Sequence, residues 1–285
     1  MEIRQPKLVA IVGQTASGKT DLAIKLAHKF NGEIICADSR TIYKGMDIGT
    51  AKPSLGQQKM VTHHMLDIIE PSERYSVARF KSQAIKIIDH LYSKNKLPIV
   101  VGGSGLYIDA LLYDFDLQCK DVRTLGNDHS LGELQDLSKK LDLKPSQQTL
   151  LNKQHLRRFI ERDGQQGSKK PTQALVLGTK IEKTILDKRI AERVDAMIDS
   201  GFINEVKNII KIYGDESYAL MAPGYKPACS FLNGEITIEE ARQQFIKNDK
   251  KLAKRQKTWF KRNPDIVWID DLEQAEQLIK EYLLQ

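Results

Sequence analysis

Residues 8–20 read Leu8-Val9-Ala10-Ile11-Val12-Gly13-Gln14-Thr15-Ala16-Ser17-Gly18-Lys19-Thr20. The first five form an unbroken apolar run, which predicts a strand buried on both faces of a sheet. The next eight match the spacing G-x-x-x-x-G-K-[ST], and a helical run from Asp21 to Lys29 follows them. The motif and its strand–loop–helix context together predict a loop that surrounds phosphate groups.

Each part of this loop has a chemical reason. Glycines let backbone N–H groups curl around phosphate oxygens, Lys19 neutralises their charge, and the Thr20 hydroxyl suits Mg²⁺. The N-terminus of the following helix adds its dipole. We expect diphosphate binding by Gly13, Gln14, Thr15, Ala16, Ser17, Gly18, Lys19 and Thr20, with Lys19 and Thr20 also catalytic and Thr20 at the metal. The loop alone leaves open whether the phosphates belong to ATP.

Further short apolar runs predict the other strands of the sheet. They are Glu33 to Ala37, Leu66 to Ile69, Ile99 to Val101, Ala174 to Leu177 and Ile266 to Ile269. Helical stretches between them predict an α/β fold, a P-loop NTPase-like parallel sheet flanked by helices. Residues 116–173 are polar, with little strand signal, and predict a small, mainly helical insertion domain between core segments 1–115 and 174–285. An amphipathic stripe from Ile181 to Ile209 follows, with Gly201 either tolerated inside it or splitting it.

The composition excludes several classes of protein. The chain has 285 residues, of which 41% are hydrophobic and 28% charged, a mixture that buries a core and argues against disorder. Its three cysteines show neither disulfide nor zinc spacing. The sequence has no apolar signal core and no apolar run of the roughly 18 residues that span a membrane. We expect a cytoplasmic monomer with no membrane contact.

The positive charge is concentrated in one segment. Between Lys247 and Arg262 there are eight basic residues and one acid, and 8 − 1 = +7 equals the formal charge of the whole chain. Ile238, Ala241, Phe245, Leu252 and Trp259 recur at helical spacing and predict one long helix near 237–262, with Trp259 in the core. Its cationic flank is either a solvated face or, as the scarcity of alternating acids favours, a nucleic-acid surface.

An acid follows the second predicted strand. Ile99 to Val101 leads into Gly102-Gly103-Ser104-Gly105, whereas in many nucleotide hydrolases such a strand leads to an acid that holds magnesium. A carboxylate stands instead at Asp38, after Glu33 to Ala37. Ligands bind at the carboxyl edge of open parallel sheets. Asp38 is therefore either a cap for the next segment or a base beside the diphosphate.

Six blocks of sequence carry a family resemblance. They are Gly13 to Thr20, Asp38-Ser39-Arg40-Thr41-Ile42-Tyr43-Lys44-Gly45-Met46-Asp47-Ile48-Gly49-Thr50-Ala51-Lys52-Pro53, His63-His64-Met65-Leu66-Asp67-Ile68, Tyr75-Ser76-Val77, Val101-Gly102-Gly103-Ser104-Gly105-Leu106-Tyr107 and Ala253-Lys254-Arg255-Gln256-Lys257-Thr258-Trp259-Phe260. In this order they resemble the tRNA dimethylallyltransferases. The likeness covers residues 8–115 and 174–270 well and the insertion poorly.

The resemblance implies an activity and a site. A dimethylallyl group would pass from dimethylallyl diphosphate to N6 of the adenosine 3′-adjacent to a tRNA anticodon. Thr15 to Thr20 would bind the diphosphate, Thr20 would lie near Mg²⁺, and Asp38 would be the general base. The residues expected to contact the anticodon stem-loop are Asp38, Ser39, Arg40, Thr41, Ser104, Gln154, His155, Leu156, Arg157 and Arg158, with Lys254 and Arg255 of the basic helix as phosphate contacts.

One departure from the family pattern affects the leaving group. Where family members usually carry Arg or Gln before Gly224, this chain has Met221-Ala222-Pro223, so we expect weaker stabilisation of the diphosphate. Two rival functions stay open. One is a P-loop kinase that uses ATP, with Arg157 and Arg158 as lid residues and Asp38 as base. The other is an RNA-binding relative with weakened catalysis.

The remaining polar and aromatic residues have modest expected roles. His63 and His64 are adjacent, so on a strand they point to opposite faces and we expect packing or hydrogen-bonding roles. Tyr43, Tyr107 and Phe115 either fill the core, line a prenyl pocket or stack on RNA, and the sequence does not separate these roles.

Overall fold

The computed structural model describes residues 7–113, 129–145, 147–161 and 173–285. The chain divides into two compact units, one formed by Met1–Leu112 with Thr172–Gln285 and the other by Tyr113–Pro171. The first unit contains the phosphate-binding loop, Asp38 and the basic helix. It therefore holds the candidate chemistry.

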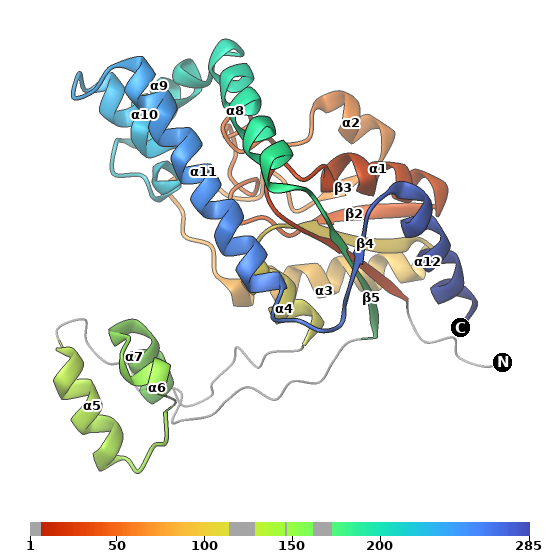
Figure 1. Cartoon of the computed structure of the whole chain (residues 1–285), viewed down its shortest axis with the longest axis horizontal. Helices are drawn as coiled ribbons and strands as arrows, with labels where there is room; N and C mark the ends of the chain where they lie inside the picture. Colours follow the sequence, from red (N-terminus) through yellow and green to blue (C-terminus); the bar gives the residue numbers. More distant parts are fainter. Residues whose placement is uncertain (1–6, 114–128, 146, 162–172) are drawn as a thin grey trace. The chain divides into compact units, whose positions relative to one another are not determined.

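A parallel six-stranded sheet is the centre of the first unit (Figure 1). Its order is β3-β2-β4-β1-β5-β6, with β1 at Leu8–Val12, β2 at Gly32–Cys36, β3 at His63–His64, β4 at Leu97–Gly102, β5 at Ala174–Thr179 and β6 at Ile266–Ile269. Val9 lies opposite Ile99 on one side and Leu175 on the other. Every residue of β1 and β4 is buried, as their apolar runs predict. The predicted α/β fold is confirmed.

One predicted strand is wrong. Leu66 to Ile69 does not form a strand, and Ile69 makes only an isolated bridge to Tyr43. The physical reason is local, because Met65 and Asp67 adopt positive φ angles of 68° and 53°, which are incompatible with an extended strand. The edge strand is instead the polar pair His63–His64.

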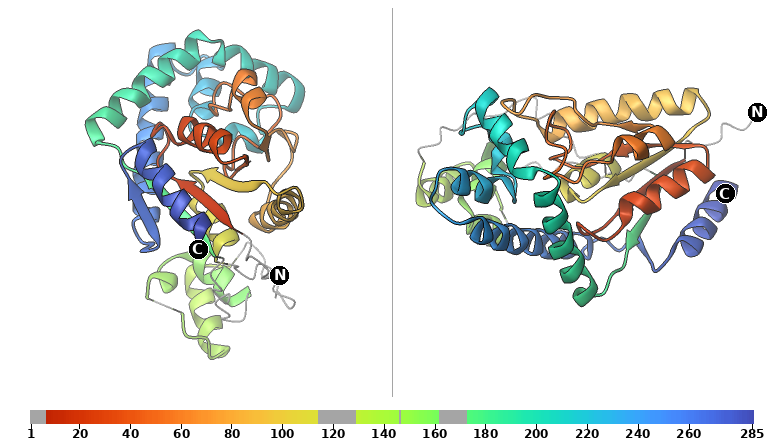
Figure 2. Two further views of the ribbon diagram at one scale, coloured as in Figure 1. Left: turned by 90° about the vertical axis from the view of Figure 1, so that its right-hand side faces the viewer. Right: turned by 90° about the horizontal axis from the view of Figure 1, so that it is seen from above.

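Helices cover both faces of the sheet (Figure 2). One face carries α1, Lys19–Lys29, and α12, Leu272–Leu284, which are joined by an ion pair between Lys29 and Glu276. The other face carries α3, Val77–Ser93, and α4, Gly105–Leu112. The short helix α2, Leu55–Met60, contacts α1. This is the layered arrangement expected when parallel strands are connected by helices.

A second helical layer follows β5. It contains α8, Lys183–Asp199; α9, Phe202–Tyr213; the 3₁₀ turn η1, Tyr218–Met221; α10, Tyr225–Leu232; and α11, Ile238–Phe260. Gly201, with a φ of 97°, separates α8 from α9, so it splits the predicted stripe. The buried faces of these helices enclose Ile42 and Tyr43 from the segment after β2. That segment and the helical layer are therefore held together by one hydrophobic core.

The second unit is helical where the structure describes it. It contains α5, Leu131–Lys140; α6, Gln147–Leu150; and α7, Lys153–Glu161. Leu134, Leu156 and Ile160 form its small core. Among the described residues of both units, no helix combines the length and the apolarity that crossing a bilayer requires.

Candidate functional site

A cavity of about 660 Å³ opens at the carboxyl edge of the sheet. Thr15 to Thr20 line it from the phosphate-binding loop, and Asp38 and Thr41 line it from the segment after β2. Arg189 and Arg193 reach it from α8. The fold thus brings predicted phosphate-binding and carboxylate residues into one space. Gln14 instead lines the neighbouring groove between α8 and α11.

The loop presents free backbone donors. Gly18 has a φ of 86°, a conformation that glycine adopts without strain. Within the described part of the chain, the backbone N–H groups of Ala16, Gly18, Lys19 and Thr20 have no hydrogen-bond partner. Free N–H groups at the start of a helix attract anions through their partial positive charge. The loop is therefore preorganised for phosphate oxygens.

Lys19 is the buried cation of the loop. Its Nζ donates a hydrogen bond to the carbonyl oxygen of Gln14 at 3.0 Å. Burial lowers the pKa of Lys19 to about 8, and the positive charge of Arg193 adds to this effect while Asp38 opposes it. A bound anion would favour the protonated form, because it would supply the negative charge that this buried ammonium lacks.

Arginines on α8 are functional candidates that the sequence analysis missed. Arg193 donates from Nη2 to Thr15 Oγ1 at 2.7 Å and to Asp249 Oδ2 at 2.6 Å. The Nη1 of Arg189 lies 3.8 Å from the position that a Cβ on Gly18 would take. Their spacing of four residues, which puts both on one helix face, was the available sequence signal. Two guanidinium groups therefore flank the loop.

Asp38 stabilises the turn that directly follows it. Its Oδ1 accepts a hydrogen bond from the Arg40 backbone N–H at 2.8 Å, and no helix begins there, so Asp38 caps a turn. The backbone N–H of Ser39, the residue between Asp38 and Arg40, donates to Ser104 Oγ at 3.0 Å. Ser39 is thereby joined to Ser104, and Thr41 lines the cavity together with Asp38.

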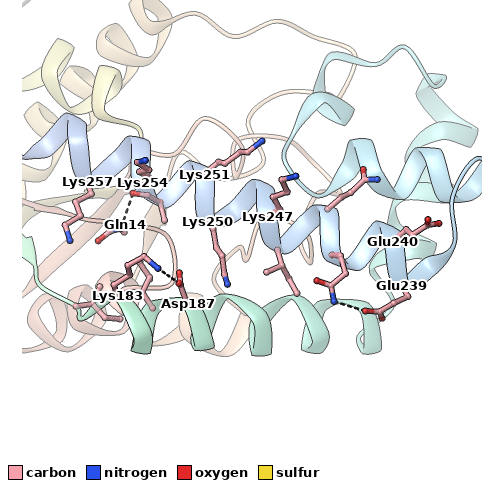
Figure 3. A pocket seen from close by; sticks show the side chains of 16 residues that line it. Gln14, Lys183, Asp187, Glu239, Glu240, Lys247, Lys250, Lys251, Lys254 and Lys257 are labelled. Carbon is pink, nitrogen blue, oxygen red and sulfur yellow. Dashed lines mark hydrogen bonds and ion pairs between the residues drawn. The ribbon is translucent and has the colours of Figure 1, made fainter.

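The polar side of α11 lines a groove of about 910 Å³ against α8 (Figure 3). Five of its lysines do so: Lys247, Lys250, Lys251, Lys254 and Lys257. Among the residues that the structure describes, none of the five makes an ion pair, whereas Asp187 of the same groove is already paired with Lys183 at 2.6 Å. Arg255 is exposed but does not line the groove. The groove therefore carries uncompensated positive charge.

The aromatic predictions have mixed outcomes. Trp259 is 38% exposed rather than part of the core, so that prediction is wrong. Its ring lies against Gly105, where a Cβ would come within 2.3 Å, and its Nε1 donates to Asp109 Oδ2 at 2.9 Å. Tyr43 and Tyr107 are buried. Phe115 lies outside the described residues.

The two histidines make hydrogen bonds, as expected. His64 Nε2 lies 2.6 Å from Glu33 Oε2, and His63 Nδ1 lies 2.8 Å from the Val61 carbonyl oxygen. Burial is the largest influence on Glu33 and raises its pKa, but hydrogen bonds from Lys96 and His64 outweigh burial and lower the pKa overall. Glu33 of β2 thus links the edge strand β3, through His64, to Lys96, the residue before β4.

The predicted RNA-contact stretch 154–158 lies on α7 of the second unit. Leu156 is fully buried there, so its side chain supports the core of the unit rather than its surface. Arg157 is half-buried. The side chains of Gln154, His155 and Arg158 lie outside the described part of the structure.

Comparisons with known proteins agree with this geometry. The family model described as IPP transferase matches residues 41–263. The chain is 37% identical to the tRNA dimethylallyltransferase of Alkaliphilus metalliredigens, covering 98% of this chain and 96% of that protein. It is 38% identical to the one of Carboxydothermus hydrogenoformans, with the same shares of the two chains covered.

Solved structures show the same likeness. The tRNA isopentenylpyrophosphate transferase of Bacillus halodurans superposes with a TM-score of 0.79 at 34% identity, covering 98% of this chain and 97% of that one. A eukaryotic dimethylallyltransferase acting on tRNA shares the fold, with a TM-score of 0.80 at 23% identity, covering 98% of this chain and 78% of that one. The chain therefore belongs to the IPP transferase family.

Proposed function

We propose that this protein transfers a dimethylallyl group from dimethylallyl diphosphate to N6 of the adenosine 3′-adjacent to a tRNA anticodon. The observation that carries this proposal is the shared cavity, which is lined by the phosphate-binding loop with Lys19, by Arg189 and Arg193 of α8, and by Asp38. The names of relatives that match nearly the whole chain support it over ATP-dependent phosphorylation. No strand-end acid follows β4, which also distinguishes the site from many nucleotide hydrolases.

The diphosphate would be held by the free N–H groups of residues 16 and 18–20 and by Lys19. Arg189 and Arg193 would supply the further positive charge that the Met221-Ala222-Pro223 segment lacks. These donors stabilise the charge that develops on the leaving diphosphate as its bond to the prenyl carbon breaks. Binding and leaving-group stabilisation then use the same groups.

The acceptor nitrogen would be deprotonated by Asp38. An exocyclic adenine amine is a weak nucleophile whose proton becomes acidic as the new C–N bond forms. The carboxylate lines the cavity beside the loop, where it can take that proton. The target base must leave its stack to arrive there, which costs least in a single-stranded loop.

Magnesium fits this cavity. Thr20 offers a hydroxyl, and Asp38, Asp270 and Asp271 line the same space. The described residues contain no cluster of three or more His, Cys, Asp or Glu side chains that could hold a metal. Mg²⁺ is commonly bound through few protein oxygens together with substrate phosphates and water. Thr20 would hold the ion, which when bound would neutralise diphosphate charge.

The RNA would be held by three groups of residues. Ser39, Arg40 and Thr41 directly follow Asp38 in the sequence, Ser104 Oγ accepts a hydrogen bond from the Ser39 N–H, and the stretch 154–158 belongs to the second unit. Lys254 lies in the lysine-lined groove, and Arg255 is exposed on the same helix. Contacts from these cations to RNA phosphates would release counterions and offset the cost of extruding the target base.

A substrate-choice assay tests the proposal. The protein is incubated with Mg²⁺, unmodified tRNA and either labelled dimethylallyl diphosphate or labelled ATP, with Lys19→Ala as the inactive control. We expect prenyl label on RNA and no ATP consumption. ATP consumption without prenylation would identify a kinase, and RNA binding with neither reaction would identify a non-catalytic relative.

A further inference from the structure

Tyr218 is an aromatic residue held at the protein surface. Its side chain is 41% exposed, whereas the next two residues, Ala219 and Leu220, are buried. Two hydrogen bonds to the Pro71 carbonyl oxygen hold the backbone of η1 around Tyr218. Ser217 Oγ donates one at 2.6 Å, and the Ala219 N–H donates the other at 3.3 Å. The ring is therefore presented by a rigid backbone.

Two arginines lie over this ring. The guanidinium carbons of Arg40 and Arg74 are 5.9 Å and 5.7 Å from its centroid. In the described part of the chain neither arginine has an ion-pair partner, and the nearby Glu73 is already paired with Arg79 at 3.8 Å. The positive charges of the two guanidinium groups repel each other, and an anion bound between them would remove this repulsion. The cluster of Tyr218, Arg40 and Arg74 therefore favours an anionic ligand with a planar group.

The cluster is connected to the reaction centre. The backbone N–H of Arg40 donates to Asp38 Oδ1 at 2.8 Å. One short segment thus carries both the carboxylate that lines the cavity and a guanidinium over Tyr218. A ligand on the cluster would therefore be bound in part by the same segment that carries Asp38.

We propose that Tyr218, Arg40 and Arg74 bind the nucleotide adjacent to the target adenosine in the RNA loop. Its base stacks on the ring or on a guanidinium plane, and its phosphate lies between the two cations. Aromatic side chains combined with arginines are the usual platform for unpaired bases. This inference rests on the proposed RNA substrate and adds a recognition site outside the catalytic cavity.

Variants of Tyr218 test the platform by direct RNA binding. Tyr218→Ala should weaken the Kd for an anticodon stem-loop about 10-fold, while Tyr218→Phe, which keeps the ring, should stay within about 2-fold. An exposed apolar side chain on α9 gives the control, since Ile212→Ala should leave the Kd unchanged. The KM for dimethylallyl diphosphate should not move in any of the three. An unchanged Kd in Tyr218→Ala, or an equal rise in the KM for the diphosphate, overturns the proposal.

A base-deletion cycle identifies the stacked nucleotide. Stem-loops with an abasic residue directly 5′ or directly 3′ of the target adenosine are bound to wild type and to Tyr218→Ala. At one of these positions the abasic residue should weaken wild-type binding but have little further effect in the variant. Additive losses at both positions contradict stacking. Because the readout is affinity, it stays informative even if no prenyl transfer occurs.

Discussion

Gln256 on α11 accepts a hydrogen bond from the backbone N–H of Thr15 at 2.7 Å, across 241 residues of sequence. Its Nε2 donates to the Gly103 carbonyl oxygen at 3.1 Å. One side chain, 7% exposed, therefore ties the phosphate-binding loop to the turn after β4. The orientation of the phosphate-binding loop therefore depends on α11, the helix whose lysines line the groove against α8.

Removing this amide should damage both stability and diphosphate binding. Gln256→Ala leaves the half-buried N–H of Thr15 and the buried carbonyl of Gly103 without their amide partner, and an unsatisfied buried polar group costs about 1–3 kcal/mol of unfolding free energy. We expect a lower thermal midpoint and a higher KM for dimethylallyl diphosphate. Gln243→Ala, on the exposed face of the same helix, should change neither. A normal KM in Gln256→Ala would show that the loop holds its shape alone.

Asp38→Asn separates proton removal from structure. The amide oxygen can still accept the hydrogen bond from Arg40, but it is a poor base, so kcat should fall about 10²- to 10⁴-fold. Loss of this negative charge removes a repulsion from the diphosphate but also lowers the pKa of Lys19 further, so the KM for the prenyl donor, measured at pH 7, should change far less than kcat. Steady-state kinetics with RNA checks this split, with Asp199→Asn on the surface as control. A variant with normal kcat would remove Asp38 from the mechanism.

Diphosphate affinity should depend on pH through Lys19. The pKa of this buried lysine is about 8 in the free protein, and a bound anion raises it. Affinity should therefore be constant below about pH 8 and fall above it, by up to about tenfold per pH unit, because binding then requires proton uptake.

Calorimetric titration with inorganic pyrophosphate measures this dependence. Lys19→Arg keeps its charge throughout this range, so the ratio of wild-type to variant affinity cancels the ionisation of the ligand itself. A ratio that does not change between pH 7 and pH 10 would contradict the assigned titration.

The lysine-lined groove should contribute to salt-dependent RNA binding. Replacing Lys247, Lys250 and Lys254 with glutamine should reduce the slope of log Kd against log salt by about 2–3, since each phosphate contact contributes roughly 0.7–0.9. Glutamine replacements at the exposed Lys86, Lys211 and Lys280 change the charge equally on other helices and should leave the slope intact. A separate Arg255→Gln variant reports whether RNA also reaches beyond the groove. Equal slopes in both triple variants would assign the groove lysines to solubility.

Local patterns in the sequence were sufficient for five of the six strands and for the phosphate-binding loop. Residues 8–20 form a contiguous strand, loop and helix start, so their spacing alone determines the motif. The apolar-run criterion failed at the edge of the sheet. There the actual strand is His63–His64, two polar residues, and positive φ angles interrupt the apolar run that follows.

The positions of Arg193 and Trp259 depend on long-range packing, which local sequence patterns do not reveal. Arg193 and Thr15 are 178 residues apart, and the four-residue spacing of Arg189 and Arg193 puts both on one helix face without indicating that this face lies against the loop. Helical periodicity also does not show which residues of an apolar stripe are exposed. Trp259 was therefore wrongly placed in the core, whereas the adjacent Phe260 is buried. Stacking against Gly105 at the protein surface accounts for its position.

The most direct test is to locate the transferred group. Unmodified tRNA is treated with the protein, Mg²⁺ and dimethylallyl diphosphate, then digested to nucleosides and analysed by mass spectrometry, alongside a tRNA in which guanosine replaces the adenosine 3′ of the anticodon. We predict one N6-dimethylallyl adenosine in the first RNA and none in the second. Unmodified adenosine in the first RNA, or equal prenylation of both, would contradict transfer to that base.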